Sequence, residues 1–321
     1  MRTHYTVGTL AVALLFAASP ARADGQAAVN NFYGNLSRAG MALSLKKENA
    51  KVESTLVRGL YALLASNGDF AGYINEAGTL RGDSSGMAVM PTARGQQARK
   101  MTAAEQAGFR AEVMHAIDYD KLVKVNYGPG SARKLIMFSA VDCGYCQRLE
   151  QDLARFGDKI DVTFYVVPMS LKAIKHGGAT QMQTVSKIWC ADDQAGAWKK
   201  YWETLTPPPA SARACAFDAQ TAERQAGHLT NILKAAGVAV RGTPSFLRED
   251  GTLLSHRSKI DVAYVNQNFG SAGAVPTPAN PQQWLVAGAA PAPGAAETAT
   301  AEPQQGAKKI KLNDVLKSLI N

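Results

Sequence analysis

The sequence predicts an α/β protein built around a strand–helix–strand unit. Residues 134–139 form an apolar run typical of a buried strand, and residues from Cys143 onward repeat apolar side chains at helical spacing. Residues 162–167 are again strand-like, and we expect this strand to end at Pro168. A strand, a helix and a strand in this order form a parallel, right-handed unit. We therefore expect an α/β domain over residues 128–270.

The rest of this domain is expected to be a helical insertion followed by more strand. Residues 171–217 are mostly helical in pattern, and a further helix is expected near 219–236. Asp250-Gly251 is a strong turn signal inside a β-hairpin at 245–255. A closing helix is expected at 260–269.

Residues 24–95 predict a smaller α+β domain. A short amphipathic helix at 24–40 is followed by β-prone segments from 51 to 86, with a hairpin signal at Asn67-Gly68. This sheet has few large apolar residues for its length, so on its own it would be marginally stable. That favours pairing with a second copy of the chain.

A linker with one helix is expected at 96–127. Residues 86–100 are small, polar and basic, and we interpret them as a connector. Thr102 and Glu105 have the spacing of a capping box, which starts a helix. Apolar residues then recur every four positions: Phe109, Val113 and Ile117. We interpret residues 102–117 as a linker helix; a packed helix of the next domain is the alternative.

The start of the chain has the pattern of a secretory signal peptide, predicted at 1–23. Arg2 precedes an apolar stretch at 7–18, and Ala21-Arg22-Ala23 resembles a cleavage site. A membrane anchor is the alternative, but it needs about 20 apolar residues, and this run is shorter. We therefore expect an exported protein.

The end of the chain, 271–321, is rich in Ala, Pro, Gly, Gln and Thr and is expected to be a disordered tail. A short amphipathic helix is expected at its end, from the apolar stripe Leu312, Val315, Leu316, Leu319 and Ile320. This helix could dock a partner, lie on a membrane surface or fold back on the body.

The net charge gives no sign of a nucleic-acid partner. Without Arg2 and Arg22, 33 of the 35 basic residues and all 26 acidic residues remain, which leaves a net charge of +7. No basic stretch is interleaved with aromatic residues, so we attribute the excess charge to solubility.

The pair Cys143-Gly144-Tyr145-Cys146 is the strongest functional signal. At a strand-to-helix junction, backbone N–H groups favour negative charge and stabilise the first sulfur as a thiolate. We expect Cys143 to be the nucleophile, with a depressed pKa, and Cys146 to be the less accessible resolving cysteine. A static structural disulfide is the alternative. Asp142 would oppose the thiolate if its carboxylate faced the sulfur, or it would cap the helix.

Cys190 and Cys215 complete the set of four cysteines. Zinc ribbons use two close pairs, whereas these two are far apart, so we favour two disulfides, one reactive and one structural, over a zinc site. A second redox relay is less favoured because neither cysteine has a close partner. The histidines show no paired spacing, and no metal or cofactor is expected.

Thr243-Pro244 lies about 100 residues after the reactive pair and directly before a strand. Proline fits a central strand only at its first residue, so Pro244 marks a strand start. By local sequence alone, a routine loop proline is the alternative.

These residues together resemble a known family. The run from Phe138 to Cys146 is similar to the active-site run of the bacterial periplasmic disulfide isomerases of the DsbC/DsbG type. Ile188-Trp189-Cys190-Ala191 followed by Cys215, and Arg241-Gly242-Thr243-Pro244, resemble that family in the same order. The similarity is specific over about 130–255, weaker over 24–127, and does not include 271–321.

The resemblance implies a thioredoxin fold with a helical insertion, preceded by a small α+β dimerisation domain and a linker helix, in a V-shaped homodimer. It implies Cys143 as attacking thiolate, Cys146 as resolving cysteine and Cys190–Cys215 as a structural bridge. Thr243 and a cis Pro244 would contact the substrate backbone. A membrane-bound thiol reductant would keep the active pair reduced. Asp142 and the long tail depart from the family pattern.

We therefore expect a periplasmic thiol–disulfide isomerase that reshuffles wrong disulfides in mispaired exported proteins. One alternative is a thiol–disulfide oxidase or reductase, which a redox potential would distinguish. The other is a chaperone-like assembly factor for an envelope secretion or conjugation machine, in which the tail recruits an extra partner and the cysteines are secondary.

Overall fold

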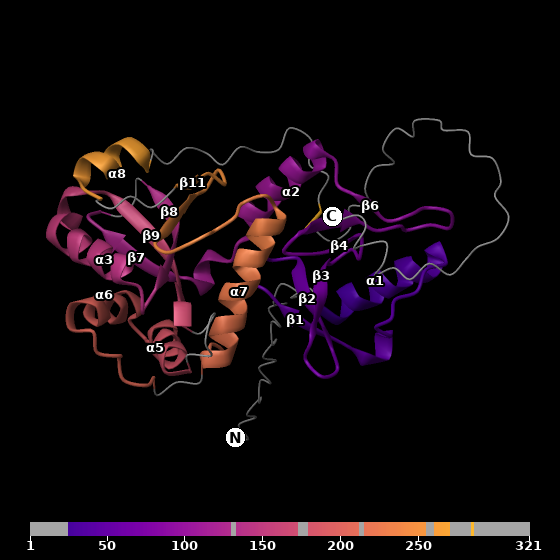
Figure 1. Cartoon of the computed structure of the whole chain (residues 1–321), viewed down its shortest axis with the longest axis horizontal. Helices are drawn as coiled ribbons and strands as arrows, with labels where there is room; N and C mark the ends of the chain where they lie inside the picture. Colours follow the sequence, from indigo (N-terminus) through magenta and orange to yellow (C-terminus); the bar gives the residue numbers. More distant parts are fainter. Residues whose placement is uncertain are drawn as a thin grey trace, which may run out of the picture.

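The computed structural model describes residues 25–129, 133–172, 179–211, 215–254, 260–269 and 284–285. It has two lobes, each built on one β-sheet (Figure 1). The predicted order of a small α+β domain, a helix and a larger α/β domain is confirmed. The signal peptide predicted at 1–23 and the amphipathic helix predicted near 312–320 lie outside the described residues.

The first lobe is an antiparallel sheet covered on one face by a helix. Its six strands pair in chain order, and helix α1 (Gly25–Ala39) buries Val29, Phe32 and Leu36 in a core that it shares with β2 and β3. The strands are β1 (Ala50–Ser54), β2 (Leu60–Ala65), β3 (Phe70–Asn75), β4 (Leu80–Asp83), β5 (Gly86–Val89) and β6 (Arg99–Lys100).

Strands β5 and β6 correct the prediction of a connector at 86–100. Met87 and Ala88 are buried, and β5 pairs with β4 at close range. Gly82 permits this approach, because a Cβ there would lie 2.2 Å from the Gly86 carbonyl oxygen. The prediction was wrong because short strands made of small residues resemble a linker in composition.

Helix α2 (Ala103–Ala116) joins the lobes, and the predicted capping box is present. The Glu105 N–H donates to Thr102 Oγ1 at 3.2 Å, and the Thr102 N–H donates to Glu105 Oε2 at 2.8 Å. Phe109 and Val113 are buried in the same apolar core as the second sheet. The helix is therefore packed as well as linking.

The second lobe is a five-stranded mixed sheet in the order β11-β10-β8-β9-β7. Its strands are β7 (Val123–Tyr127), β8 (Lys134–Ala140), β9 (Val162–Met169), β10 (Ser245–Arg248) and β11 (Leu253–Leu254). Strands β8 and β9 are parallel and joined through α3 (Gly144–Phe156), as the sequence predicts. The other helices are α5 (Ala179–Trp189), α6 (Gln194–Thr204), α7 (Ala219–Ala235) and α8 (Val262–Asn268), with 3₁₀ turns at Lys47–Asn49, Tyr119–Lys121 and Gly157–Lys159.

Two details of the second sheet differ from the prediction. Strand β7 lies inside the segment 96–127 that was expected to be linker, although its buried Val123 and Val125 alternate with exposed Lys124 and Asn126. Strand β9 continues through Pro168 instead of ending there. Strand β9 pairs with β7 only as far as Val166, and at Pro168 it pairs with β8 alone. Because proline has no N–H to donate, it fits this position, where β9 is paired on one side only.

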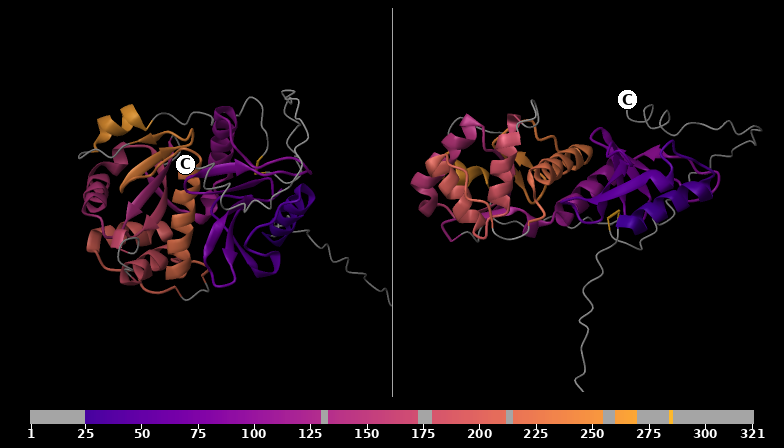
Figure 2. Two further views of the ribbon diagram at one scale, coloured as in Figure 1. Left: turned by 45° about the vertical axis from the view of Figure 1, so that its right-hand side comes forward. Right: turned by 90° about the horizontal axis from the view of Figure 1, so that it is seen from below.

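Helix α7 lies between the two lobes and covers the face of the first sheet opposite α1 (Figures 1 and 2). The Tyr73 hydroxyl and His228 Nδ1 are 3.0 Å apart in the buried interface. At its edge, Arg224 Nε lies 3.1 Å from Glu53 Oε2. The sheet that the sequence predicted to be marginal is thus stabilised within its own chain, and the homodimer stays a prediction.

Two residues of the expected disordered tail are buried. Trp284 and Leu285 pack into the main apolar core, whereas the rest of the tail predicted at 271–321 lies outside the described residues. Of the helices that the structure describes, none is long and apolar enough to cross a membrane.

Candidate active site

Cys143 occupies the N-cap of α3, directly after the turn that follows β8. Its backbone is extended, with φ −105° and ψ 116°, and its carbonyl accepts the first helical hydrogen bond from the Gln147 N–H at 3.0 Å. The Cys143 N–H donates back to the Ala140 carbonyl at 3.1 Å, which closes the turn. The sulfur therefore lies where the unpaired N–H groups of a helix begin.

The two sulfurs differ in burial, and both are free thiols in this structure. Cys143 is 6% exposed and Cys146 is fully buried, with Sγ accepting the Ala140 N–H at 3.4 Å. Tyr145, between them, is 58% exposed and marks where the pair meets the surface. Cys143 is thus the more accessible sulfur of the two.

Their pKa values move in opposite directions. The Cys143 pKa is lowered to about 5, first by the hydrogen bond with the Cys146 thiol and then by the Thr243 side chain and the Cys146 and Tyr145 backbone N–H groups, against the effect of burial. Burial, followed by the hydrogen bond with Cys143, raises the pKa of Cys146. At neutral pH the pair is therefore one thiolate beside one thiol.

Thr243 and Pro244 lie beside the cysteine pair. Strand β10 pairs with β8, with Ser245 opposite Phe138, so the loop before β10 reaches the end of β8. The Thr243-Pro244 bond is cis, and the Cys143 thiol donates to the Thr243 carbonyl at 3.3 Å. The Thr243 hydroxyl is buried and has no hydrogen-bond partner among the described residues while Cys143 is a thiol; it lowers the Cys143 pKa as a donor to the thiolate.

Asp142 takes neither of the two positions considered from the sequence. Its carboxylate accepts the Ser170 hydroxyl at 2.9 Å and the Leu171 and Lys172 N–H groups at 2.8 Å each. It therefore caps the segment after β9, and these three donors hold its charge. This contact ties the turn before Cys143 to the start of the insertion.

Comparison with known proteins finds a family that resembles this lobe. Residues 121–259 match the family described as thioredoxin-like domain. This part of the chain, somewhat less than half of it, is similar to thioredoxin-like domains. The fold implied by the resemblance is confirmed, and the match includes β7, consistent with its place in the sheet.

Curated relatives of the thioredoxin-like domain carry one description. Two proteins called probable thiol:disulfide interchange protein DsbC, from Bordetella parapertussis and Bordetella bronchiseptica, are each 29% identical over 151 residues, or 46% of this chain and 47% of the relative. A third, from Bordetella pertussis, is 28% identical over 157 residues, or 49% of each chain. The chain spans about half the length of the curated relatives it matches. The resemblance to DsbC-type proteins is thus confirmed as a distant relationship.

Solved structures give weaker matches. A disulfide interchange protein from Neisseria gonorrhoeae is 26% identical, with a TM-score of 0.33 over 43% of this chain and 86% of that chain. A linker-deletion variant of Proteus mirabilis ScsC is 17% identical, with a TM-score of 0.34 over 47% and 76%. At such TM-scores neither match bears on fold or function.

The other cysteines of the thioredoxin-like domain are bonded to each other. Cys190, at the end of α5, forms a disulfide with Cys215, before α7. Trp189 stacks on Phe217 beside this bond, with ring centroids 4.5 Å apart. The bond uses two of the four sulfurs that the zinc alternative would need.

Sequence reasoning missed a buried carboxyl on the active-site helix. Glu150 lies one turn after Cys146 and accepts the Tyr127 hydroxyl at 2.8 Å and Trp198 Nε1 at 3.0 Å. Burial raises its pKa to about 7, against the lowering effect of these two bonds. The available signal was an acidic residue on the apolar face of α3, in register with Cys146.

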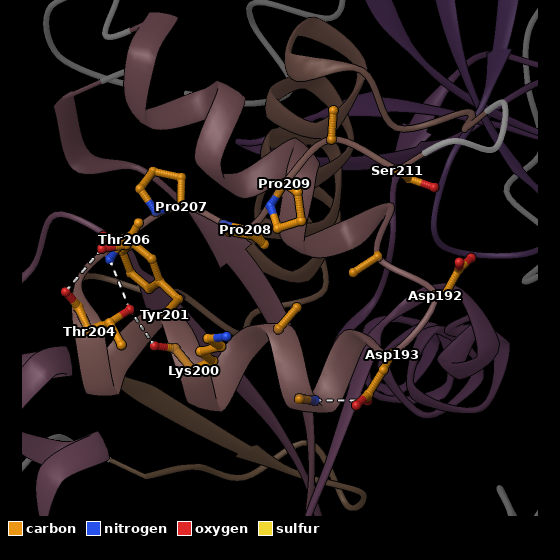
Figure 3. Close-up of a pocket in the computed structure, with 14 residues that line it drawn as sticks. Asp192, Asp193, Lys200, Tyr201, Thr204, Thr206, Pro207, Pro208, Pro209 and Ser211 are labelled. Carbon is orange, nitrogen blue, oxygen red and sulfur yellow. Dashed lines mark hydrogen bonds between the residues drawn. The ribbon is translucent and has the colours of Figure 1, made fainter.

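A cavity of about 460 Å³ lies between α6 and the segment that follows it. Figure 3 shows the residues that line it, among them Tyr201, Pro207, Pro208 and Pro209. None of the predicted site residues lines it. Tyr201 reaches from this cavity toward the active-site turn, because its hydroxyl donates to the Val141 carbonyl at 2.8 Å. The cavity therefore lies behind the turn and separate from the sulfurs.

Proposed function

We propose that the chain is a thiol–disulfide interchange enzyme whose attacking atom is Cys143 Sγ. The observation that carries the proposal is the position of Cys143 at the start of α3, where its pKa is about 5, with the Cys146 thiol buried behind it. At neutral pH Cys143 is mostly thiolate, the form that attacks disulfides. The distant relatives named as thiol:disulfide interchange proteins support the same chemistry.

The reaction starts when the Cys143 thiolate attacks one sulfur of a client disulfide. The client S–S bond breaks, a mixed disulfide forms, and the second client sulfur leaves as a thiolate. If a client thiolate then attacks the mixed disulfide, a new client pairing forms and Cys143 is regenerated without net oxidation. If Cys146 loses its proton and attacks instead, the client leaves reduced and Cys143–Cys146 becomes a disulfide.

Thr243 and Pro244 are the proposed substrate-binding residues. The Cys143 thiol donates a hydrogen bond to the Thr243 carbonyl, whereas a thiolate has no proton to donate. Ionisation of Cys143 therefore frees that carbonyl to accept a backbone N–H from a client strand beside the sulfur.

We propose that the chain works as a disulfide isomerase in the periplasm. Its clients are mispaired exported proteins, and a membrane-bound thiol reductant is its electron donor.

A homodimer is proposed through an edge of the first sheet. Strand β1, five residues long, is an edge strand and can pair with its counterpart in a second copy. The proposed structural bridge is Cys190–Cys215.

Refolding of a scrambled multi-disulfide protein tests the activity. The reduced wild type should restore the native pairing, and Cys146→Ser should accumulate a mixed disulfide with the client because it cannot release it. Cys143→Ala is the matched control and should trap nothing. If the wild type restores no native pairing and Cys146→Ser traps no client, the interchange proposal fails.

The redox potential, read together with the reaction on clients, separates isomerase from the alternatives. Equilibration with glutathione should leave the pair largely reduced at the poise where an isomerase works. A pair with a strongly oxidising potential would be reduced at the same poise, so net disulfide formation in reduced clients, with no reshuffling, is the result that would assign an oxidase. If Cys143→Ala keeps the cellular phenotype while deletion of 307–321 loses it, the chaperone-like assembly factor is the better assignment.

A further inference from the structure

Trp284 and Leu285 form a buried anchor in a segment, 271–306, of mostly small and polar composition. They are 3% and 6% exposed, and they pack into the apolar core of the body. In the sequence, Trp284-Leu285-Val286 is the only run of large apolar residues between 271 and 306. The one apolar run of this segment thus includes the two residues whose contacts with the body the structure describes.

The body recognises the backbone of this dipeptide as well as its side chains. Asn75 Nδ2 donates to the Trp284 carbonyl at 2.6 Å, and the Leu285 N–H donates to Glu112 Oε2 at 2.9 Å. Asn75 is fully buried. Specific hydrogen bonds to both residues distinguish the contact from nonspecific apolar packing.

Asn75 is oriented by contacts that do not involve the tail. Its Oδ1 accepts the Thr79 and Leu80 N–H groups at 2.8 Å each, which fixes the amide plane and aims Nδ2 at the position of the Trp284 carbonyl. Gly59 allows the chain to approach, because a Cβ there would lie 2.1 Å from the Leu285 carbonyl oxygen. The site is therefore shaped before the tail arrives.

Glu112 supplies the acceptor for the Leu285 N–H. Burial raises the pKa of its carboxyl, and the backbone N–H groups of Trp284 and Leu285 act against that rise. Its Oε1 is buried without another hydrogen-bond partner among the described residues. Without the tail, a buried carboxylate would lose the donors that compensate it.

We propose that Gly59, Asn75 and Glu112 form a peptide-binding site for the chain's own Trp284–Leu285 segment, and that the docked tail braces α2 against the first sheet. Gly59 precedes β2, Asn75 ends β3 and Glu112 lies on α2, so one dipeptide contacts three elements. Only 14 residues separate Phe269 from Trp284, so the tether raises the local concentration of the tail and favours docking within one chain.

Hydrogen exchange on the full chain tests the brace, independently of any redox activity. In the wild type the Leu285 amide should exchange at least about tenfold more slowly than an unstructured amide. Trp284→Ala combined with Leu285→Ala should speed exchange about tenfold in the C-terminal half of α2 and in residues 56–60. The matched control, Gln282→Ala with Gln283→Ala, should leave both regions unchanged.

Tryptophan quenching tests Glu112 separately. All four tryptophans, Trp189, Trp198, Trp202 and Trp284, are buried, so acrylamide should quench little of the wild-type emission. Glu112→Ala should add a quenchable component of about one tryptophan in four, because the Leu285 N–H loses its acceptor and the tail is no longer held. Adding Trp284→Ala should remove that component.

Four results would overturn the proposal. The first is an unprotected Leu285 amide in the wild type, and the second is unchanged exchange in α2 when the anchor is removed. The third is quenchable emission that survives Trp284→Ala, since it would arise from unfolding elsewhere. The fourth is protection of Leu285 that is lost on dilution, since the site would then hold the tail of a second copy.

Discussion

Cys143 Sγ lies 3.3 Å from the carbonyl oxygen of Thr243, a residue 100 positions later in the chain. The two meet because β8 and β10 are antiparallel neighbours in the sheet, so the last residues of β8 lie beside the first residues of β10. Thr243 offers the sulfur two different groups. Its carbonyl accepts from the thiol, whereas its hydroxyl can donate to the thiolate.

Removing that hydroxyl should raise the Cys143 pKa. Thr243→Val keeps the shape of the side chain but has no donor, and a hydrogen bond to a charged group contributes about 1.5 kcal/mol, or about one pKa unit. The pKa should therefore rise from about 5 toward about 6. Thiolate absorbance at 240 nm, followed against pH in the reduced protein, measures it. Thr243→Ser retains a donor and should stay near the wild type; equal values for Val and wild type would exclude this role.

Asp142→Ala should destabilise the fold with little effect on the thiolate. The change removes the acceptor for Ser170, Leu171 and Lys172, and loss of such a cap costs about 1–2 kcal/mol. Urea denaturation measures this loss. The Cys143 pKa should stay near about 5, because the carboxylate is held by donors after β9. A marked drop of that pKa in Asp142→Asn would instead place the carboxylate charge against the sulfur.

Local patterns predicted the parts of the fold that depend on local chemistry. The β8–α3–β9 unit is readable because apolar spacing changes from strand to helix at Cys143. The capping box at Thr102 and the turn at Asp250-Gly251 were predictable for the same reason. In both the capping box and the turn, the hydrogen-bond partners of the backbone groups lie within a few residues in the sequence.

Contacts between distant segments could not be read in this way. The donors that hold Asp142 lie 28–30 positions away, and the partners of Trp284 and Leu285 lie 209 and 173 positions away. Nothing near Glu150 in the sequence identifies Tyr127 and Trp198 as its partners. The family resemblance supplied the thioredoxin fold, but these contacts needed the three-dimensional arrangement.

Breaking the Cys190–Cys215 disulfide should lower stability without abolishing thiol chemistry. The bond closes a loop with a sequence separation of 25, which is worth roughly 3–4 kcal/mol in the chain-entropy account. Cys190→Ser with Cys215→Ser is preferred to a single change, because no unpaired thiol remains to interfere. Urea denaturation should show the loss, while the 240 nm titration of Cys143 should keep its midpoint. An unchanged unfolding midpoint would mean that the bridge does not stabilise the folded chain.

Glu150 should make the protein less stable as pH rises from about 4.5 to about 7. Its folded pKa, about 7, lies above the ordinary value of 4.5, chiefly because the carboxyl is buried. In this interval the folded state holds a proton that the unfolded state has released, so the slope of stability against pH is negative, with a total change of up to about 3 kcal/mol. Glu150→Gln cannot ionise and should lose this decline; its one carbonyl oxygen can still accept from Trp198 Nε1, while its NH2 group can donate to the Tyr127 hydroxyl. Urea midpoints of both proteins at several pH values measure the difference. A wild-type stability that rises relative to Glu150→Gln across this interval would show that the carboxylate, and not the acid, is the form the fold favours.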